Sequence, residues 1–579
     1  MHLAKDAYWQ LLLHMNSGVS EIDDSSFFFS ANGARDAEAE LNATLDAFFS
    51  DEIKDDNSSI CRFPARYAWF EEKLDAYDLP TASCPEYDKI FNRVDPKSVT
   101  FVFPSAHINS PASMFGHTFL RINSSYNSKL LSYAINYAAN ANMDTENGVI
   151  FAIKGLFGGY YGKYSLLPYY EKLKEYRDSE QRDIWEYDLN LTQEETVRMF
   201  RHIWELNGTY SYYYFFTENC SYNMLWFLEA ARPKLQLRNK FLYQVTPLET
   251  VHVANEQGLI ESTHYRPSKR TTLLKYEDLL NEKGIETIIK VMDNNTSVNL
   301  MLEAKNISLE QKRYLLEAGV EYLEYEYSRG KIQKERYLWL FHRLTSERSK
   351  LGITKDIKIK TPPNPLESHQ ALRVTLGGGV RDNEAIGYLG FRVAYHDLED
   401  SNYGFLRGTQ IEFGDILLSQ QKDTTRLEKA TIISIVSLAQ RSAFFKSFSW
   451  RTKIGWDRNS LSEDAAFYGG VGAGYSWGNK LAYIYFLADP FFYVDKSFHT
   501  GVGGSVGFSI DKYEFMNTNF EFTQRIYDTS DTQALLKLSQ GFRVSQNFQI
   551  MLKYDYKQRV QANTKNDESS LGLMLKYYY

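Results

Sequence analysis

The last strand-like stretch of the chain has an alternating pattern that predicts a membrane-spanning strand. Counting back from the C-terminus, every second residue is apolar or aromatic: Tyr579, Tyr577, Leu575, Leu573 and Leu571. A strand with one continuous apolar face that ends on an aromatic residue is typical of the closing strand of a transmembrane β-barrel. The pattern therefore predicts a barrel at the C-terminus, in a chain that must be exported before it inserts.

The same alternation recurs through the C-terminal part of the chain. A representative run has an apolar or aromatic face and a polar face: Phe548, Ile550, Leu552, Tyr554 and Tyr556 against Gln549, Lys553, Asp555 and Lys557. Many of these runs exceed about 10 residues, the length that a tilted strand needs to cross a bilayer. About twelve such segments lie between residues 370 and 579, an even number, as in bacterial barrels. We therefore predict an antiparallel transmembrane barrel whose lumen is largely filled by charged side chains of both signs.

Ahead of the barrel, the periodicity changes twice. Apolar residues recur at helical spacing up to about residue 90, strand-like runs follow, and a helical pattern returns over residues 270–350. The proline-rich segment 361–365 then predicts a stiff extended linker. The predicted fold is multidomain α+β, with a helical N-terminal domain at 1–92, a mixed α+β domain at 93–265, a helical connector at 266–366 and the barrel of about twelve strands at 367–579.

The composition suits an exported membrane protein and argues against nucleic acid as a partner. The formal net charge is −8, and Lys and Arg form no cluster. Aromatic residues make up 15% of the chain, which suits the aromatic girdles of an outer-membrane barrel. No window approaches ~18 consecutive apolar residues, so strands are expected to cross the membrane. The N-terminal apolar run 11–13 is too short for a secretory signal, so we expect the signal to have been removed or left out.

Three cysteines, Cys61, Cys84 and Cys220, give an odd count for an exported protein. In an oxidising periplasm this suggests one pair and one free thiol. Cys61 and Cys84 both stand at loop-like positions, so we predict that they form a disulfide and leave Cys220 free. The alternative is that all three are reduced and buried.

Cys220 and His117 stand at positions that suit thiol chemistry. Cys220 begins an apolar helical run that Pro233 ends, and the helix dipole lowers the pKa of a thiol at a helix N-terminus. His117 leads into an apolar strand, and a thiolate on a helix start with an imidazole on a strand is the arrangement of papain-like enzymes. Two other interpretations stay open: an inert buried cysteine beside a structural histidine, or a metal site, although no Cys-x-x-Cys or His-x-x-x-His spacing supports a metal.

The residues around this pair resemble a known family. Ser-Met-Phe-Gly-His-Thr-Phe-Leu-Arg at 113–121, Asn-Tyr at 136–137, residues 182–187 and Asn-Cys-Ser at 219–221 are similar to the Lnb-type N-terminal periplasmic domain family. The resemblance covers about residues 95–265, and the flanking helices and barrel resemble the longer Gram-negative members. It implies a circularly permuted papain-like fold and, as the founding activity, intramolecular acyl transfer on bacterial lipoproteins. The barrel takes the place of the membrane anchoring expected of the founding enzymes.

The resemblance also implies roles for individual residues. Cys220 is expected to be the nucleophile, His117 the general base, and Asn136 the group that orients the imidazole. The backbone N–H of Cys220 and a donor from the 109–113 loop are expected to form the oxyanion hole, with Ser113 and Asn219 as substrate or oxyanion residues.

These expectations combine into one functional hypothesis and an alternative. The hypothesis is an outer-membrane barrel that carries a periplasmic thiol acyltransferase or hydrolase, acting on lipid or lipoprotein acyl groups through a thioester at Cys220. The expected partners are outer-membrane lipids, lipoproteins or phospholipids as substrates, and the barrel assembly machinery; no cofactor, metal or nucleic acid is expected. The alternative is a non-catalytic periplasmic binding module that aids transport or envelope assembly.

Overall fold

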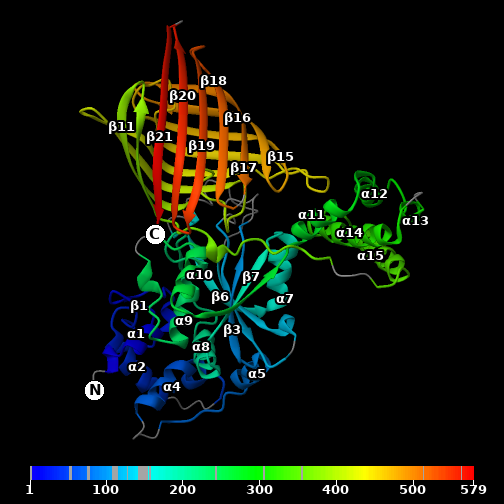
Figure 1. The fold of residues 1–579 in the computed structure, drawn as a ribbon. Helices are drawn as coiled ribbons and strands as arrows, with labels where there is room; N and C mark the ends of the chain where they lie inside the picture. The colour runs from blue at the N-terminus through cyan, green and yellow to red at the C-terminus, as the bar shows by residue number, and fades with distance from the viewer. Residues whose placement is uncertain are drawn as a thin grey trace. The chain divides into compact units, whose positions relative to one another are not determined.

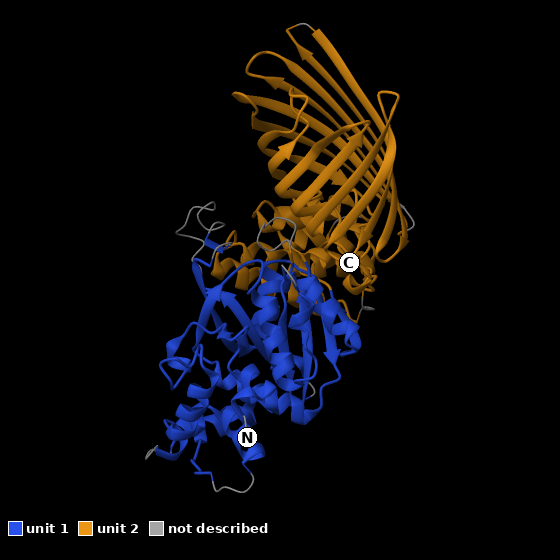
Figure 2. Cartoon of the chain, turned by 90° about the vertical axis from the view of Figure 1, so that its left-hand side faces the viewer, with its two compact units in different colours: residues 1–105, 116–266 blue, residues 106–115, 267–579 orange. Residues whose placement is uncertain are grey.

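The structure is a computed structural model in which the chain forms two compact units. The N-terminal unit comprises residues 1–105 and 116–266, and the barrel unit comprises residues 106–115 and 267–579 (Figure 2). The described residues are 3–50, 55–74, 79–106, 115–126, 128–140, 154–155, 158–241, 244–303, 307–353, 357–512, 514–562 and 564–579.

The N-terminal unit begins with short helices that pack through aromatic side chains. They are α1 (Ala7–Leu12), α2 (Ala37–Ser50), α3 (Ser59–Arg62), α4 (Pro64–Lys73) and α5 (Pro85–Val94), with the two-residue strands β1 (Met15–Asn16) and β2 (Val19–Ser20). Trp9 of α1 stacks on Trp69 of α4 with ring centroids 5.1 Å apart. The Arg66 guanidinium lies 2.6 Å from the Glu40 carboxylate, and both are fully buried. Removing one partner would leave an uncompensated buried charge, so this pair fixes how α2 and α4 meet.

An antiparallel sheet of seven strands forms the centre of the described part of the N-terminal unit. Its strand order is β8-β6-β5-β4-β3-β7-β9; β3, β6 and β7 of this sheet are labelled in Figure 1. The bounds are β3 Ser98–Pro104, β4 Phe119–Asn123, β5 Tyr133–Ala139, β6 Tyr160–Pro168, β7 Ile184–Leu189, β8 Tyr210–Tyr213 and β9 Ile260–Arg266. The accompanying helices are α7 Tyr169–Leu173, α8 Gln193–Glu205, α9 Cys220–Ala231 and α10 Pro247–Glu256, with a π-helical turn at Lys174–Ser179.

Helix α9 is the buried element of this unit. All of its residues are buried, which its run of apolar side chains explains. It contacts β4 and β5 of the sheet and the helices α8 and α10. Because β4 follows His117 and β5 contains Asn136, this packing places the start of α9 against the two strands that matter for the candidate site.

In the barrel unit, helices precede the barrel. They are α11 Lys269–Leu279, α12 Glu282–Met292, α13 Val298–Leu302, α14 Leu309–Ser328 and α15 Lys334–Ser349. Their shared core includes Phe444 and Phe445 from the loop after β13. Glu277 of α11 accepts hydrogen bonds from Ser442 Oγ at 2.8 Å and from the Phe444 backbone N–H at 2.7 Å. Among the described residues, no helix is long and apolar enough to span a membrane.

The barrel itself closes with twelve antiparallel strands in the described part of the chain. They are β10 Arg373–Arg381, β11 Glu384–His396, β12 Thr409–Gln421, β13 Thr424–Ser437, β14 Ser449–Asp457, β15 Ala466–Gly478, β16 Ala482–Val494, β17 Phe498–Lys512, β18 Met516–Tyr527, β19 Thr532–Ser545, β20 Phe548–Gln561 and β21 Thr564–Tyr578. First and last strands pair, with Arg373 opposite Tyr578. The predicted fold class, including the antiparallel barrel of about twelve strands, is confirmed.

The final strand shows the predicted two faces. Leu571, Leu573, Leu575 and Tyr577 are exposed, at 56%, 46%, 39% and 54% of their surface. The residues between them are buried, including Met574, Lys576 and Tyr578. A strand with an apolar outer face and with polar side chains such as lysine and tyrosine on its buried inner face is typical of an outer-membrane barrel.

Candidate functional site

The candidate nucleophile lies at the first position of a well-capped helix. Asn219 is the N-cap of α9: its Oδ1 accepts hydrogen bonds from the backbone N–H groups of Ser221 at 2.9 Å and Tyr222 at 3.1 Å. Its Nδ2 donates to two backbone carbonyls, at 2.6 and 3.0 Å. The polar atoms of the Asn219 side chain thus cap the helix, and its expected substrate or oxyanion role stays a prediction. The cap leaves the N–H of Cys220, the residue before Ser221, without a partner from Asn219.

His117 precedes β4, at a point where the backbone of the neighbouring Gly116 packs closely against Phe103. The preceding Gly116 has φ +86°, and a Cβ there would lie 2.6 Å from a ring carbon of Phe103, so only glycine fits. The His117 ring stacks on Tyr176 with centroids 5.4 Å apart. Tyr176 belongs to the π-helical turn, a feature that often marks functional sites.

Asn136 fixes the orientation of the imidazole. Its Oδ1 lies 2.9 Å from His117 Nε2, and its backbone lies on β5, which pairs with β4. Because Nε2 faces the amide oxygen, it carries the proton in the neutral ring, and Nδ1 is the nitrogen left to face the thiol.

His117 and Cys220 interact directly, and the contact shifts both pKa values. Burial raises the pKa of the Cys220 thiol, but the charge of His117 and hydrogen bonds from His117, Ser221 and the Thr118 backbone outweigh burial and lower it to about 7. Burial lowers the pKa of His117, but the Cys220 charge and its hydrogen bonds to Cys220 and Asn136 raise it above its usual range. Cys220 is only 6% exposed. A buried thiol held beside an imidazole in this way is a thiol prepared for nucleophilic attack.

Ser113 and the 109–113 loop, from which substrate or oxyanion contacts were expected, lie outside the described residues. Sequence reasoning missed two tyrosines: Tyr176, which stacks on His117, and Tyr213, whose hydroxyl is hydrogen-bonded to the side chain and the backbone N–H of Cys220. Neither stands in a recognisable motif, and the long aromatic run 210–216 gave no signal for which ring would meet the thiol.

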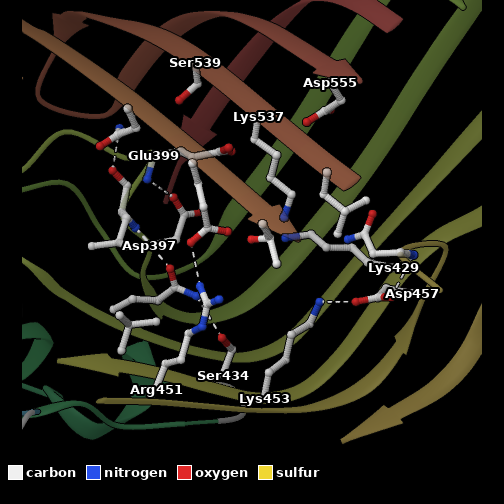
Figure 3. Close-up of a pocket in the computed structure, with 18 of the residues that line it drawn as sticks. Asp397, Glu399, Lys429, Ser434, Arg451, Lys453, Asp457, Lys537, Ser539 and Asp555 are labelled. Atoms are coloured by element: carbon white, nitrogen blue, oxygen red, sulfur yellow. Dashed lines mark hydrogen bonds and ion pairs between the residues drawn. The ribbon is translucent and has the colours of Figure 1, made fainter. Parts of the chain in front are cut away.

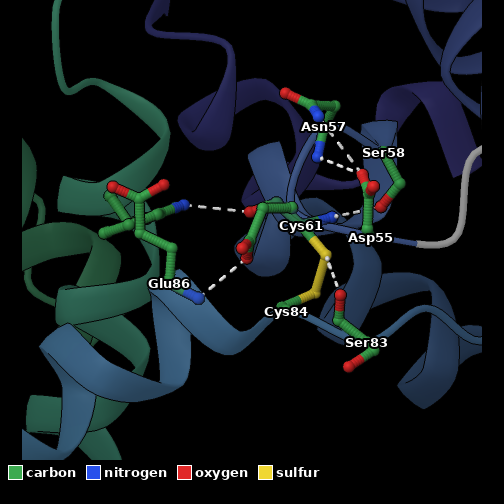
Figure 4. Close-up of a disulfide and its surroundings, with 9 residues drawn as sticks. Asp55, Asn57, Ser58, Cys61, Ser83, Cys84 and Glu86 are labelled. Atoms are coloured by element: carbon green, nitrogen blue, oxygen red, sulfur yellow. Dashed lines mark hydrogen bonds between the residues drawn. A yellow bond between two sulfur atoms is a disulfide. The ribbon is translucent and has the colours of Figure 1, made fainter.

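The other two cysteines form a disulfide. Cys61 of α3 is bonded to Cys84, the residue before α5, with Cα atoms 5.4 Å apart (Figure 4). The Glu86 backbone N–H at the start of α5 also donates to Asp56 at 2.8 Å, so α5 is held at two neighbouring points. Cys220 is the free cysteine of the chain.

Within the described barrel lies a polar cavity of about 310 Å³ that is lined by charges of both signs (Figure 3). Lys453 and Asp457 are paired at 2.5 Å, and Arg451 pairs with Asp489 at 2.7 Å and with Glu521 at 2.6 Å. The inner face of the barrel thus carries charged side chains of both signs, and these pair with one another around the cavity.

A loop folds into the barrel at the mouth where β10 begins and β21 ends. It is residues 397–400, directly after β11. The Glu399 carboxylate lies 2.8 Å from Lys553 Nζ on β20, and the carbonyl of Leu398 accepts a hydrogen bond from Asn519 of β18 at 2.8 Å. Asp400 lies 2.5 Å from Arg392 and 2.9 Å from Lys576, and Tyr578 donates to it at 2.7 Å. The loop therefore crosses the lumen from β11 to strands on the far wall.

A second loop is bonded across the barrel at the opposite mouth. It is residues 458–460, after β14. Arg458 lies 3.2 Å from Glu428 of β13 and 2.9 Å from Glu568 of β21. The Ser460 carbonyl accepts hydrogen bonds from Gln533 at 2.8 Å and Arg559 at 2.9 Å. The cavity thus lies between two loops that are each bonded across the barrel.

One group among the described residues brings possible metal ligands together: His369, His396 and Asp400, with ligand atoms within 4.8 Å of one another. Asp400 is already bonded to Arg392 and Lys576, as described above. The positive charges of those two side chains oppose a further cation, so the donor set does not suit a metal ion.

Four family models match consecutive segments of the chain. The model of the Lnb N-terminal periplasmic domain matches residues 86–257. Three domains of unknown function match the rest: DUF7843 at residues 1–73, DUF7842 at residues 263–358 and DUF7840 at residues 362–578. A search of curated proteins found no match.

Solved structures similar to the chain include outer-membrane porins and channels. The KdgM porin in complex with disordered oligogalacturonate is 8% identical, with a TM-score of 0.23, and the match covers 36% of this chain and 99% of that one. The NanC porin is 9% identical, with a TM-score of 0.24, over 36% of this chain and all (100%) of that one. The COG4313 outer membrane channel from Pseudomonas putida F1 is 8% identical, with a TM-score of 0.25, over 39% of this chain and 100% of that one. Similarities this remote carry no information on activity.

The predicted location is confirmed: the barrel lies in the outer membrane and the N-terminal domains lie in the periplasm. The predicted family is confirmed as well. Residues 86–257 belong to the Lnb N-terminal periplasmic domain family and are carried here by an outer-membrane protein whose chain ends in a closed barrel.

Proposed function

We propose that the domain at residues 86–257 is a cysteine acyltransferase or hydrolase that acts on acyl groups of lipids or lipoproteins in the periplasm. The observation that carries the proposal is the arrangement of Cys220, His117 and Asn136: a thiol with its pKa lowered to about 7, an imidazole in contact with it, and an amide oxygen 2.9 Å from the far ring nitrogen. Each role matches a part of a papain-like site.

The proposed reaction has two steps. The Cys220 thiolate attacks the carbonyl carbon of an acyl ester, the C–S bond forms, and the ester C–O bond breaks. The departing alkoxide takes a proton from the His117 imidazolium. In the second step His117 removes a proton from an amine or from water, which attacks the thioester carbonyl, and the C–S bond breaks to regenerate the thiol.

The anchoring of the chain favours lipid-linked substrates. The barrel ties the Cys220 site to the outer membrane within one polypeptide, so the local concentration of membrane-held acyl groups is high at the site. Diacyl phospholipids and lipoproteins both offer acyl esters there. We therefore propose membrane lipids and lipoproteins as substrates in preference to soluble peptides.

The test is detection of the covalent intermediate. Full-length protein in detergent micelles is incubated with a diacyl phospholipid or a diacylated lipopeptide, and intact-mass spectrometry searches for an acyl group on Cys220. Wild-type protein should gain one acyl mass and Cys220→Ala none. If neither substrate acylates the wild-type protein, and envelope lipids and lipoproteins are unchanged in cells without it, the proposal is wrong and the binding-module alternative gains.

A further inference from the structure

The Arg182 side chain is a buried cation with unused hydrogen-bond donors. The residue is 3% exposed, and its Nη2 lies 2.7 Å from the Glu180 carboxylate. Its Nε and Nη1 are buried and have no hydrogen-bond partner among the residues that the structure describes. A buried donor on a charged group is costly to leave unpaired, so its two free nitrogens indicate a place where a ligand accepts hydrogen bonds.

The sheet places Arg182 and His117 at the same end of β3, which lies between β4 and β7. The His117 N–H donates to the carbonyl of Pro104, the last residue of β3, at 3.3 Å. Pro104 also pairs with Ile184 of β7, the second residue after Arg182. Because neighbouring strands lie about 4.8 Å apart, the backbones of Arg182 and His117 lie roughly 10 Å from each other across β3.

The side chains of Arg182 and His117 meet at the ring of Tyr176. The Arg182 guanidinium carbon lies 5.3 Å from the centroid of this ring, and the His117 ring stacks on it at 5.4 Å. The Arg182 backbone N–H also donates to the Tyr176 carbonyl at 2.8 Å, which ties the residue to the π-helical turn. Arg182 is therefore linked through a single ring to the imidazole that contacts Cys220.

A second buried cation lies against the same ring. The Nζ of Lys172 is 5.5 Å from the Tyr176 centroid and 2.7 Å from the Glu175 carboxylate. The side chains of Glu175 and Glu180 are 43% and 34% exposed, whereas those of Lys172 and Arg182 are 10% and 4% exposed. Water screens exposed charges more than buried ones, so the buried side of this cluster favours an anion.

We propose that Arg182 binds the phosphate of a glycerophospholipid, which makes phospholipids the preferred acyl donors of Cys220. The inference rests on the proposed function. Phosphate oxygens accept hydrogen bonds from guanidinium N–H groups, and arginine is especially suited to phosphate. In a phospholipid the phosphorus is a few bonds from the nearer ester carbonyl, a length that suits the short path from Arg182 to His117. A diacylated lipoprotein has the esters but lacks this phosphate.

The recognised group leaves with the product. The acyl group passes to the Cys220 thiolate, the ester C–O bond breaks, and the lysophospholipid alkoxide takes the proton of the His117 imidazolium. Arg182 stays protonated and forms no covalent bond, so it acts as a substrate-binding residue.

The test compares two acyl donors that differ only in the phosphate: dioctanoyl phosphatidic acid and dioctanoylglycerol. Full-length protein in detergent micelles is incubated with each donor, and intact-mass spectrometry follows the acylation rate of Cys220. A third arm adds inorganic phosphate to dioctanoylglycerol, and a fourth uses a diacylated lipopeptide. Alkylation of Cys220 by iodoacetamide reports on the thiol without any acyl donor. The variants are Arg182→Gln, Arg182→Lys and, as the matched control, Arg177→Gln from the same π-helical turn, whose side chain is 35% exposed.

Wild-type protein should be acylated about 10–100-fold faster by the phosphatidic acid than by dioctanoylglycerol, the usual contribution of hydrogen bonds to a charged group. Arg182→Gln should lower the rate with phosphatidic acid to that with dioctanoylglycerol, while Cys220 is still alkylated. Arg182→Lys should recover only part of the preference, because an ammonium group keeps the charge but not the guanidinium geometry. Arg177→Gln should keep the full preference.

Equal rates for the two donors in wild-type protein would overturn this inference and leave the proposed function standing, and so would faster acylation by the lipopeptide. This comparison needs no variant, so it holds even if Arg182→Gln fails to fold. An Arg182→Lys variant that is alkylated normally and keeps the full preference would show that the guanidinium does not hold the phosphate. A rate restored by inorganic phosphate would assign Arg182 to free phosphate and overturn the lipid assignment. A wild-type protein that alkylates normally but is acylated by no donor would overturn the proposed function, and this inference with it.

Discussion

Asn136 Oδ1 lies 2.9 Å from His117 Nε2 and thereby determines which side of the imidazole faces Cys220. The bond joins neighbouring strands, since Asn136 lies on β5 and His117 leads into β4. Two strands of one sheet are a rigid support, so the ring cannot turn its Nε2 toward the thiol without losing this bond. The reactivity of Cys220 therefore depends on a hydrogen bond that the thiol does not make.

The rate at which Cys220 is alkylated should depend on pH in the way that its lowered thiol pKa implies. Because the thiolate is the nucleophile and the pKa is about 7 in the folded protein, the iodoacetamide rate should rise with pH and reach half its plateau near pH 7. His117→Ala removes the charge that lowers the pKa, so its midpoint should move up toward about 8.5, the value of a free cysteine. Intact-mass spectrometry between pH 5 and pH 10 gives both curves. A midpoint that does not move in His117→Ala would show that the imidazole does not activate the thiol.

Asn136 should matter less than His117 in turnover. His117→Ala removes the general base and should lower kcat by about 10²–10⁴-fold. Asn136→Ala removes only the orienting bond and should cause a smaller loss in kcat, with a KM close to that of wild type. Kinetics with p-nitrophenyl octanoate separate the two parameters. If Asn136→Ala loses as much as His117→Ala, the amide takes part in the reaction itself and its assignment as a positioning residue is wrong.

Features of the fold and the site that depend on neighbouring residues could be predicted from the sequence, whereas those that depend on contacts between distant segments could not. The outward face of β21 could be predicted from the sequence because lipid-facing side chains recur at every second residue. Leu571, Leu573 and Leu575 follow this pattern. The partners His117 and Cys220 were readable because a motif surrounds each. Tyr213 was not, because its position depends on β8 pairing with β6, a long-range contact that no local pattern encodes. No local pattern marks the loop at 397–400 for the same reason: Lys553, the partner of Glu399, lies more than 150 residues away in sequence.

The disulfide should stabilise the N-terminal unit. Cys61 and Cys84 close a loop with a sequence separation of 23 residues, and loss of such a bond typically costs about 2–4 kcal/mol of unfolding free energy. Tryptophan fluorescence during guanidinium unfolding of the full-length protein reports on this unit through the stacked pair Trp9 and Trp69. The double variant Cys61→Ser/Cys84→Ser should unfold at lower denaturant than wild type. Coinciding transitions would contradict a stabilising role for the bond.

The barrel should not conduct ions as an open pore. The loop at 397–400 is bonded across one mouth, and the loop at 458–460 is bonded across the other. Between them, Arg451 of β14 pairs with Glu521 of β18 across the lumen. In planar bilayers the full-length protein should show no stable open-channel current. A variant with residues 458–460 replaced by Gly and Ser still has the first loop and should stay closed, whereas adding Glu399→Ala and Asp400→Ala should produce open-channel events. Steady conductance by the wild-type protein would show that these loops do not close the lumen.

The outward face of β21 should tolerate charge according to depth. Leu573 lies in the middle of the strand and is 46% exposed on the apolar face. Placing a guanidinium there exposes it to lipid, so Leu573→Arg should cost about 2–4 kcal/mol of barrel stability and reduce the heat-resistant folded form seen in gel mobility. Asp567→Arg, at an exposed position near the start of the same strand and on the same face as Leu573, is the matched control and should cost about 0–1 kcal/mol, because the penalty falls near the membrane surface. If the two variants are equally stable in urea titrations, Leu573 does not face the bilayer core, and the depth of the strand in the membrane must be reassigned.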